Sequence, residues 1–154
     1  MRTTKWVLLA IGIILVAIQF LQPSRNKSVQ PWATDISSVV QIPDSVQIIL
    51  RKACYDCHSN NTNYPFYSYV QPVGWFLARD IKHGRNQLNF NEFGSYPARR
   101  QISKLDGITY NVKENSMPLK SYRLMHKEAR LPENEKTLLI NWAQLTLKNL
   151  SGEK

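Results

Sequence analysis

The sequence predicts an all-α protein in which one helical domain follows a single N-terminal transmembrane helix. Residues 6–21 are apolar apart from Gln19, and basic residues stand just before them. Further along, several stretches repeat apolar side chains with the period of a helix, and none shows the sustained alternation of a strand. A chain of 154 residues is long enough for one ordinary domain and too short for two.

The N-terminal apolar stretch is expected to span a membrane and to remain on the protein. As a helix, residues 6–21 would be about 24 Å long, slightly short of a hydrocarbon layer of about 30 Å. The stretch ends in bulky residues and lacks the small residues that a signal peptidase requires. We therefore assign residues 1–22 to a signal anchor and residues 23–43, which are rich in proline and serine, to a tether.

Residues 44–150 are predicted to form the domain, which contains the pentapeptide Cys54-Tyr55-Asp56-Cys57-His58. Two thiols at this spacing, followed at once by a histidine, form the attachment pattern of a c-type haem. Each thiol would add to one haem vinyl group, and His58 would bind the iron from the proximal face. A structural zinc would need a second pair of ligands, which is missing, and a thioredoxin-type dithiol would need a βαβ context. The expected cofactor is one covalent haem c with its iron.

The first two helices of the domain are expected on either side of this motif. A helix from Asp44 has an apolar face with helical spacing, and it delivers Cys54 in its last turn. A second helix is expected over residues 72–84, with Pro72 in its first turn and Gly84 as its stop.

Two more helices are expected in the second half of the domain. One covers residues 98–112, although Gly107 weakens the helical signal. The last begins with Pro132 and two acidic residues, and Lys148 lies near its end. Its buried side is expected to contain Leu138, Leu139, Trp142, Ala143 and Leu145.

The loop after the haem motif is rich in aromatic residues, and apolar rings against a haem control its dielectric surroundings. Three rings are expected to form part of the haem wall: Tyr64, Phe66 and Tyr67. The second ring nitrogen of His58 needs a hydrogen-bond acceptor that fixes the ring plane. Pro65 and Pro72 are the two candidates to offer a backbone carbonyl for this bond.

Met117 is the expected sixth ligand of the iron, because a thioether suits low-spin haem iron and raises its reduction potential. Pro118 restricts the backbone of Met117 to an extended form, which can hold the side chain inward. The alternatives are that Met117 only fills a gap in the core, that Met125, His126 or His83 binds the iron, or that the sixth position is open.

In their order, these elements resemble a class I, single-haem cytochrome c. More specifically, the chain resembles the small bacterial haem-binding domain family over about residues 30–147. The motifs that carry this resemblance are CYDCHSN at 54–60, YPFYSY at 64–69, PVGW at 72–75, DIK at 80–82, LNF at 88–90 and MPL at 117–119. The resemblance implies that Cys54 and Cys57 hold the haem, that His58 is the proximal ligand and that Met117 is the distal ligand.

The expected function is electron transfer by a membrane-tethered cytochrome. Haem attachment of this kind takes place outside the bacterial cytoplasm, so the domain should face the periplasm and residues 6–21 should cross the inner membrane. With both axial positions filled, the iron has no room for a substrate and the protein is expected to be a carrier for an unidentified redox partner, not an enzyme. The formal net charge is +9, but the basic residues form no stripe of the kind that binds nucleic acid.

The sequence leaves two other functions open. A haem-based sensor or gas-binding module would have an open or displaceable distal position. A small peroxidase-like enzyme is disfavoured because the chain has one haem motif and no clear acid–base pair close to it in sequence, which leaves room only for weak activity.

Overall fold

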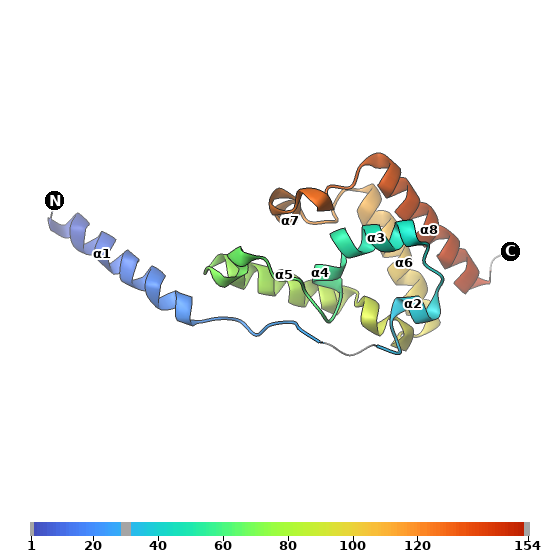
Figure 1. Cartoon of the computed structure of the whole chain (residues 1–154), viewed down its shortest axis with the longest axis horizontal. Helices are drawn as coiled ribbons and strands as arrows, with labels where there is room; N and C mark the ends of the chain where they lie inside the picture. The colour runs from blue at the N-terminus through green and yellow to red at the C-terminus, as the bar shows by residue number, and fades with distance from the viewer. Residues whose placement is uncertain (1, 29–31, 153–154) are drawn as a thin grey trace.

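The computed structural model describes residues 2–28 and 32–152, and every regular element in these ranges is a helix (Figure 1). The prediction of an all-α protein is confirmed. Helix α1 (Arg2–Ala17) extends away from the domain, and the 3-10 turn η1 (Ile18–Phe20) that follows it is hydrogen-bonded to the domain through Gln19. The segment Thr3–Phe20 is long and apolar enough to cross a membrane, and none of its residues is buried.

The domain is built from short and medium helices joined by compact turns. Its α-helices are α2 (Ile36–Val39), α3 (Asp44–Ala53), α4 (Tyr55–His58), α5 (Val73–Gln87), α6 (Ala98–Lys113), α7 (Lys120–Met125) and α8 (Glu133–Ser151). Its 3-10 turns are η2 (Phe66–Tyr69), η3 (Phe90–Ser95) and η4 (Lys127–Ala129).

The core lies where α6 and α8 pack together and α3 crosses them (Figure 1). Leu50, Leu105 and Leu139, one from each of these helices, have no exposed surface. Each such side chain contributes about 1.5–3 kcal/mol through its removal from water. Phe93 of η3 is equally buried. This core holds the C-terminal end of α3, and therefore the haem motif, in a fixed position.

The chain before α3 also takes part in this core. Residues 36–40 fall within the predicted tether, yet Ile36 is fully buried and Val40 is 9% exposed. The indole Nε1 of Trp142 donates a hydrogen bond of 3.0 Å to the carbonyl of Gln41. Residues 29–31 of the predicted tether lie outside the described residues. The folded part therefore includes α2 and the residues that join it to α3.

The predicted helices are confirmed, but two details of their ends and faces were wrong. Gly84 does not stop α5, which continues to Gln87. This glycine instead lets α5 pack closely against Cys57 of the haem motif. On α8, Leu138 and Leu145 are exposed, and Thr146 takes a buried position instead. The hydroxyl of Thr146 is satisfied by a hydrogen bond of 2.8 Å to the Trp142 carbonyl, so its burial leaves no unpaired donor.

Candidate functional site

The haem motif forms a single helical turn at the end of α3. Cys54 caps α3, and its carbonyl accepts hydrogen bonds from the N–H groups of Cys57 at 3.2 Å and His58 at 2.9 Å. The peptide then becomes extended at Ser59, as expected for a chain that leaves the helix immediately after the iron ligand. Both thiols and the imidazole are thus presented by one rigid turn whose position is set by the core.

The two cysteines are unpaired, partly buried thiols. Burial, aided by the charge of the neighbouring thiol, raises the pKa of Cys54 to about 12. Burial and the carboxylates of Asp56 and Asp80 raise the pKa of Cys57 to about 12. A nucleophilic or zinc-binding cysteine needs a lowered pKa. The surroundings instead suit neutral sulfur, the form that cysteine has in a thioether to haem.

His58 is held by the end of α5 and not by either proline proposed from the sequence. Its Nδ1 lies 3.0 Å from the carbonyl oxygen of Leu88, the residue that caps α5. Neither Pro65 nor Pro72 supplies this contact, so that prediction was wrong. A carbonyl only accepts, so Nδ1 carries the proton and Nε2 is the nitrogen with a lone pair for iron. Burial lowers the pKa of His58, although the carbonyls of Leu88 and Gly84 oppose the effect, and the ring is kept neutral.

A cavity of about 410 Å³ lies beside Cys57, between α5 and α7. Its lining is mostly apolar: Cys57, Tyr67, Val73, Phe76, Leu77, Arg79, Asp80, Leu119, Ser121, Tyr122, Leu124 and Met125. Apolar walls of this kind fit the flat face of a haem macrocycle. Arg79 offers a cation that can pair with the propionate carboxylates of a haem. The chemistry of this lining therefore suits a haem, although Cys57 is the one residue of the Cys54–His58 motif that lines the cavity.

The residues predicted to surround the haem are not all at this cavity. Tyr67 lines it, whereas Phe66 is 82% exposed and points to solvent. Tyr64 turns toward the chain after the anchor, and its hydroxyl accepts a hydrogen bond of 2.7 Å from the Asn26 N–H. Met117 is half-buried beside α6 and does not line this cavity, although Met125 does. The roles of these residues at the iron stay predictions.

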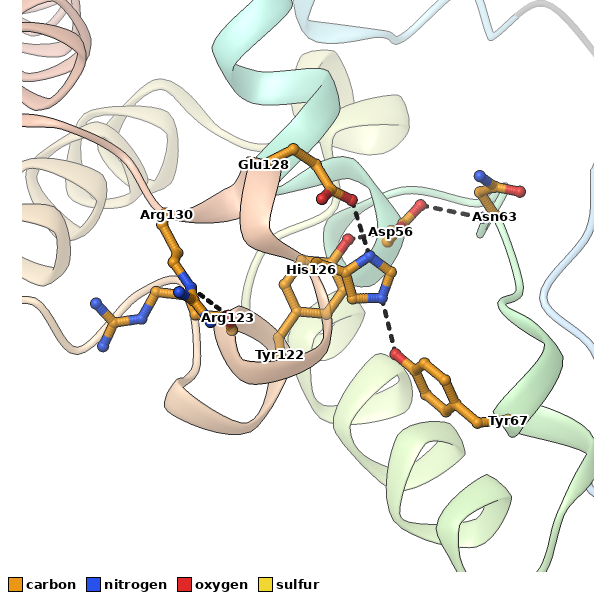
Figure 2. Close-up of polar contacts among 8 residues, drawn as sticks. All are labelled: Asp56, Asn63, Tyr67, Tyr122, Arg123, His126, Glu128 and Arg130. Carbon is orange, nitrogen blue, oxygen red and sulfur yellow. Dashed lines mark hydrogen bonds and ion pairs between the residues drawn. The ribbon is translucent and has the colours of Figure 1, made fainter.

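A polar network that sequence reasoning missed connects the haem motif with α7 (Figure 2). His126 lies between the hydroxyl of Tyr67, 2.7 Å from Nε2, and the carboxylate of Glu128, 3.1 Å from Nδ1. Tyr122 stacks on the His126 ring at 4.2 Å and donates a hydrogen bond of 2.7 Å to Asp56. The Glu128 carboxylate only accepts, so Nδ1 is the donor to it and Nε2 accepts from Tyr67.

This network has two consequences for the site. Both ring nitrogens of His126 are engaged, so neither is free to bind iron in this arrangement. Burial, the main cause, raises the pKa values of Tyr67 and Tyr122, and the Asp56 charge adds to the effect, so both phenols keep their protons. In the sequence, the one signal for this cluster is that His126, like Met125 before it, is an alternative candidate for the iron ligand.

Comparison with known proteins supports a haem protein. Over 142 residues the chain is 24% identical to cytochrome c peroxidase Ccp of Escherichia coli (strain K12). The matched part covers 86% of this chain but only 30% of that relative. No solved structure gives a significant match.

A family model also matches most of the chain. The family model described as a haem-binding domain matches residues 13–145, which include the Cys54–His58 turn, the cavity and the core around them. The chain therefore belongs to the haem-binding domain family.

Proposed function

We propose that this protein is a membrane-tethered periplasmic c-type cytochrome of bacteria, which transfers electrons through one haem held by Cys54 and Cys57. The observation that supports it most is the Cys54–His58 turn, in which the Leu88 carbonyl orients His58 next to two partly buried, unpaired thiols. The haem supplies the redox chemistry. The chain supplies its attachment, a neutral proximal imidazole and an apolar cavity that limits water.

Covalent attachment is tested with protein matured in a bacterium that exports and assembles c-type cytochromes. We expect haem to remain on the denatured polypeptide. In the pyridine haemochrome spectrum, Cys54→Ala and Cys57→Ala should each move the α-band to longer wavelength, because each removes one thioether. Haem that separates from the denatured wild-type chain would contradict the proposal.

The electron-carrier role depends on a filled sixth position, for which Met117 is the proposed ligand. We expect Met117→Ala to abolish the sulfur-to-iron charge-transfer band of the oxidised protein and to lower the reduction potential. Met125→Ala is the matched control, because Met125 lines the cavity beside Cys57. Loss of the band in the control instead would assign the sixth ligand to Met125. A high-spin resting state that binds carbon monoxide readily would favour a sensor.

Peroxide reduction is a second candidate, favoured by the Tyr67–His126–Glu128 chain beside the cavity. The printed name of the Escherichia coli relative also refers to a peroxidase, although this chain spans only 30% of it. A histidine hydrogen-bonded to a carboxylate is an ordinary acid–base pair. Turnover of peroxide by the haem-loaded protein that falls in His126→Ala would support this activity, and no turnover would exclude it.

A further inference from the structure

The loop that carries η2 exposes a compact group of apolar side chains next to the anchor helix. Phe66 is 82% exposed, Tyr69 58% and Val70 52%, and we call these three residues the tip. Phe20, at the end of the anchor, is also 82% exposed. Figure 1 shows this loop at the end of the domain that lies closest to α1. Large apolar side chains gathered at one site indicate a surface that another apolar phase covers.

Two glutamines clamp the end of the anchor to this loop. Gln19 accepts a hydrogen bond of 2.8 Å from the Gln71 N–H and donates one of 3.1 Å to the Gln71 carbonyl. Gln22 donates to the Tyr69 carbonyl at 3.1 Å and accepts from the Gln71 amide at 3.0 Å. These hydrogen bonds join residues about fifty positions apart in the chain. They therefore fix the position of the η2 loop along the axis of the anchor helix.

Residues just after the anchor reinforce the same contact. The Trp75 indole donates a hydrogen bond of 2.7 Å to the Leu21 carbonyl. Arg25 lies over the rings of Tyr64 at 4.5 Å and Tyr69 at 4.0 Å. Tryptophan and tyrosine are enriched where a protein crosses from hydrocarbon to headgroups, and arginine side chains near the end of a span extend to the same layer. The composition of the contact therefore matches the boundary layer of a bilayer.

The length of the anchor sets the depth of the tip. The candidate membrane span Thr3–Phe20 has 18 residues, which as a helix cover about 27 Å, against about 30 Å for the hydrocarbon layer. The whole stretch is needed to cross, so Gln19 lies at the membrane boundary. Because Gln19 is bonded to Gln71, the adjacent Val70 lies at that boundary as well.

We propose that the tip inserts into the interfacial layer of the same membrane that α1 spans, on the side of the haem domain. This inference rests on the proposed membrane anchoring and goes beyond it, because the domain is then held in one orientation and does not swing on a tether. Arg25 and Lys27 follow the span directly, at the depth where long basic side chains extend toward the headgroups. Tyr67, which lines the cavity beside Cys57, belongs to the same turn as the tip, so the haem is held close to the membrane surface.

The test uses the full haem-loaded chain in nanodiscs of phosphatidylethanolamine and phosphatidylglycerol. Haem attachment consumes Cys54 and Cys57, so one introduced cysteine can be labelled with an environment-sensitive fluorophore. The labelled positions are Ile13 in the anchor, Phe66 and Val70 in the tip, and Gln144 on the exposed face of α8. Quenching is measured with aqueous iodide and with lipids that carry shallow spin labels. Each signal is divided by the fluorescence of the same label without quencher, which cancels the constant loss of fluorescence that the haem causes.

We expect labels at Phe66 and Val70 to be quenched several-fold less by iodide than the label at Gln144, and to be quenched by the shallow lipids. Phe66→Asp should raise iodide quenching at Val70, whereas Gln144→Asp should not. Because Phe66 is already exposed, this substitution does not disturb the core.

A protected Ile13 with a tip as accessible as Gln144 would overturn membrane insertion and leave the anchoring intact. The tip would then be a surface for a protein partner. Iodide access to Ile13 would overturn the anchoring itself, and with it the insertion.

Discussion

Gly84→Ala is the substitution that tests most directly how α5 packs on the haem motif. A Cβ at this position would lie 2.8 Å from the carbonyl oxygen of Cys57, 3.1 Å from its Cβ and 3.3 Å from its carbonyl carbon. These atoms belong to the backbone or adjoin it, so no rotamer change relieves the clash. To restore an ordinary contact of 3.4 Å, α5 must retreat by about 0.6 Å from the Cys57 oxygen.

The expected cost follows from two opposing effects. Overpacking of this kind costs about 1–3 kcal/mol, whereas alanine in place of glycine in a helix gains about 1 kcal/mol. We expect a net loss of about 1 kcal/mol, and about 2 kcal/mol at most. The same retreat, taken along the bond from His58 Nδ1 to the Leu88 carbonyl, would lengthen it from 3.0 Å to about 3.6 Å, beyond hydrogen-bonding range. A weaker bond makes His58 a poorer electron donor to iron, so the reduction potential should rise.

Gly107→Ala in α6 is the matched control, because a Cβ there meets nothing within 4 Å. It should gain up to about 1 kcal/mol and leave the potential unchanged. Denaturant unfolding of the haem-loaded full chain in detergent, followed by haem absorbance, measures the stability of both variants. Spectroelectrochemistry measures the potential. A Gly84→Ala protein at least as stable as Gly107→Ala, with an unshifted potential, would refute the packing described for α5.

Three further predictions concern contacts between separate segments of the domain, and the same unfolding assay tests each of them. Ile36→Ala should cost about 2–5 kcal/mol because the side chain is fully buried, and a cost near zero would remove α2 from the domain. Trp142→Phe keeps a large ring but loses the hydrogen bond to Gln41, so a loss of about 1 kcal/mol is expected, and no loss would contradict that bond. Glu135→Gln removes the ion pair of 2.6 Å with Lys52, whose partners are about a quarter exposed. It should cost about 0.5–1 kcal/mol at low salt and less at high salt, and a salt-independent cost would argue against an electrostatic origin.

Local sequence signals were reliable where a helix depends mainly on its own residues. The apolar face of α3 predicts that helix, and Pro132 with the acidic residues after it predicts the start of α8. The expected side-chain cap of α3 was wrong, because Pro43 takes the N-cap position and Asp44 is the first helical residue. The same signals failed where a partner element decides. The local preference of glycine predicts a helix stop at Gly84, but the close approach of Cys57 requires a glycine at this position within α5.

The candidate site divides in the same way. The Cys54–His58 spacing is a property of one helical turn, so it could be recognised in the sequence. The hydrogen-bond acceptor for His58 could not, because Leu88 reaches it only when α5 has packed against the motif. Nor could the partners of His126, since Tyr67 is 59 positions away.

The helical class, the apolar N-terminal stretch and the haem motif could be recognised in the sequence, because each depends on residues that are close together in the chain. The tertiary structure alone decided that Ile36 and Val40 belong to the core and that the Leu88 carbonyl orients His58. It also decided that Gln71 holds the loop with η2 against the end of the anchor. Each of these contacts joins separate segments, and which polar group meets which becomes defined only when the helices have buried their apolar faces against one another.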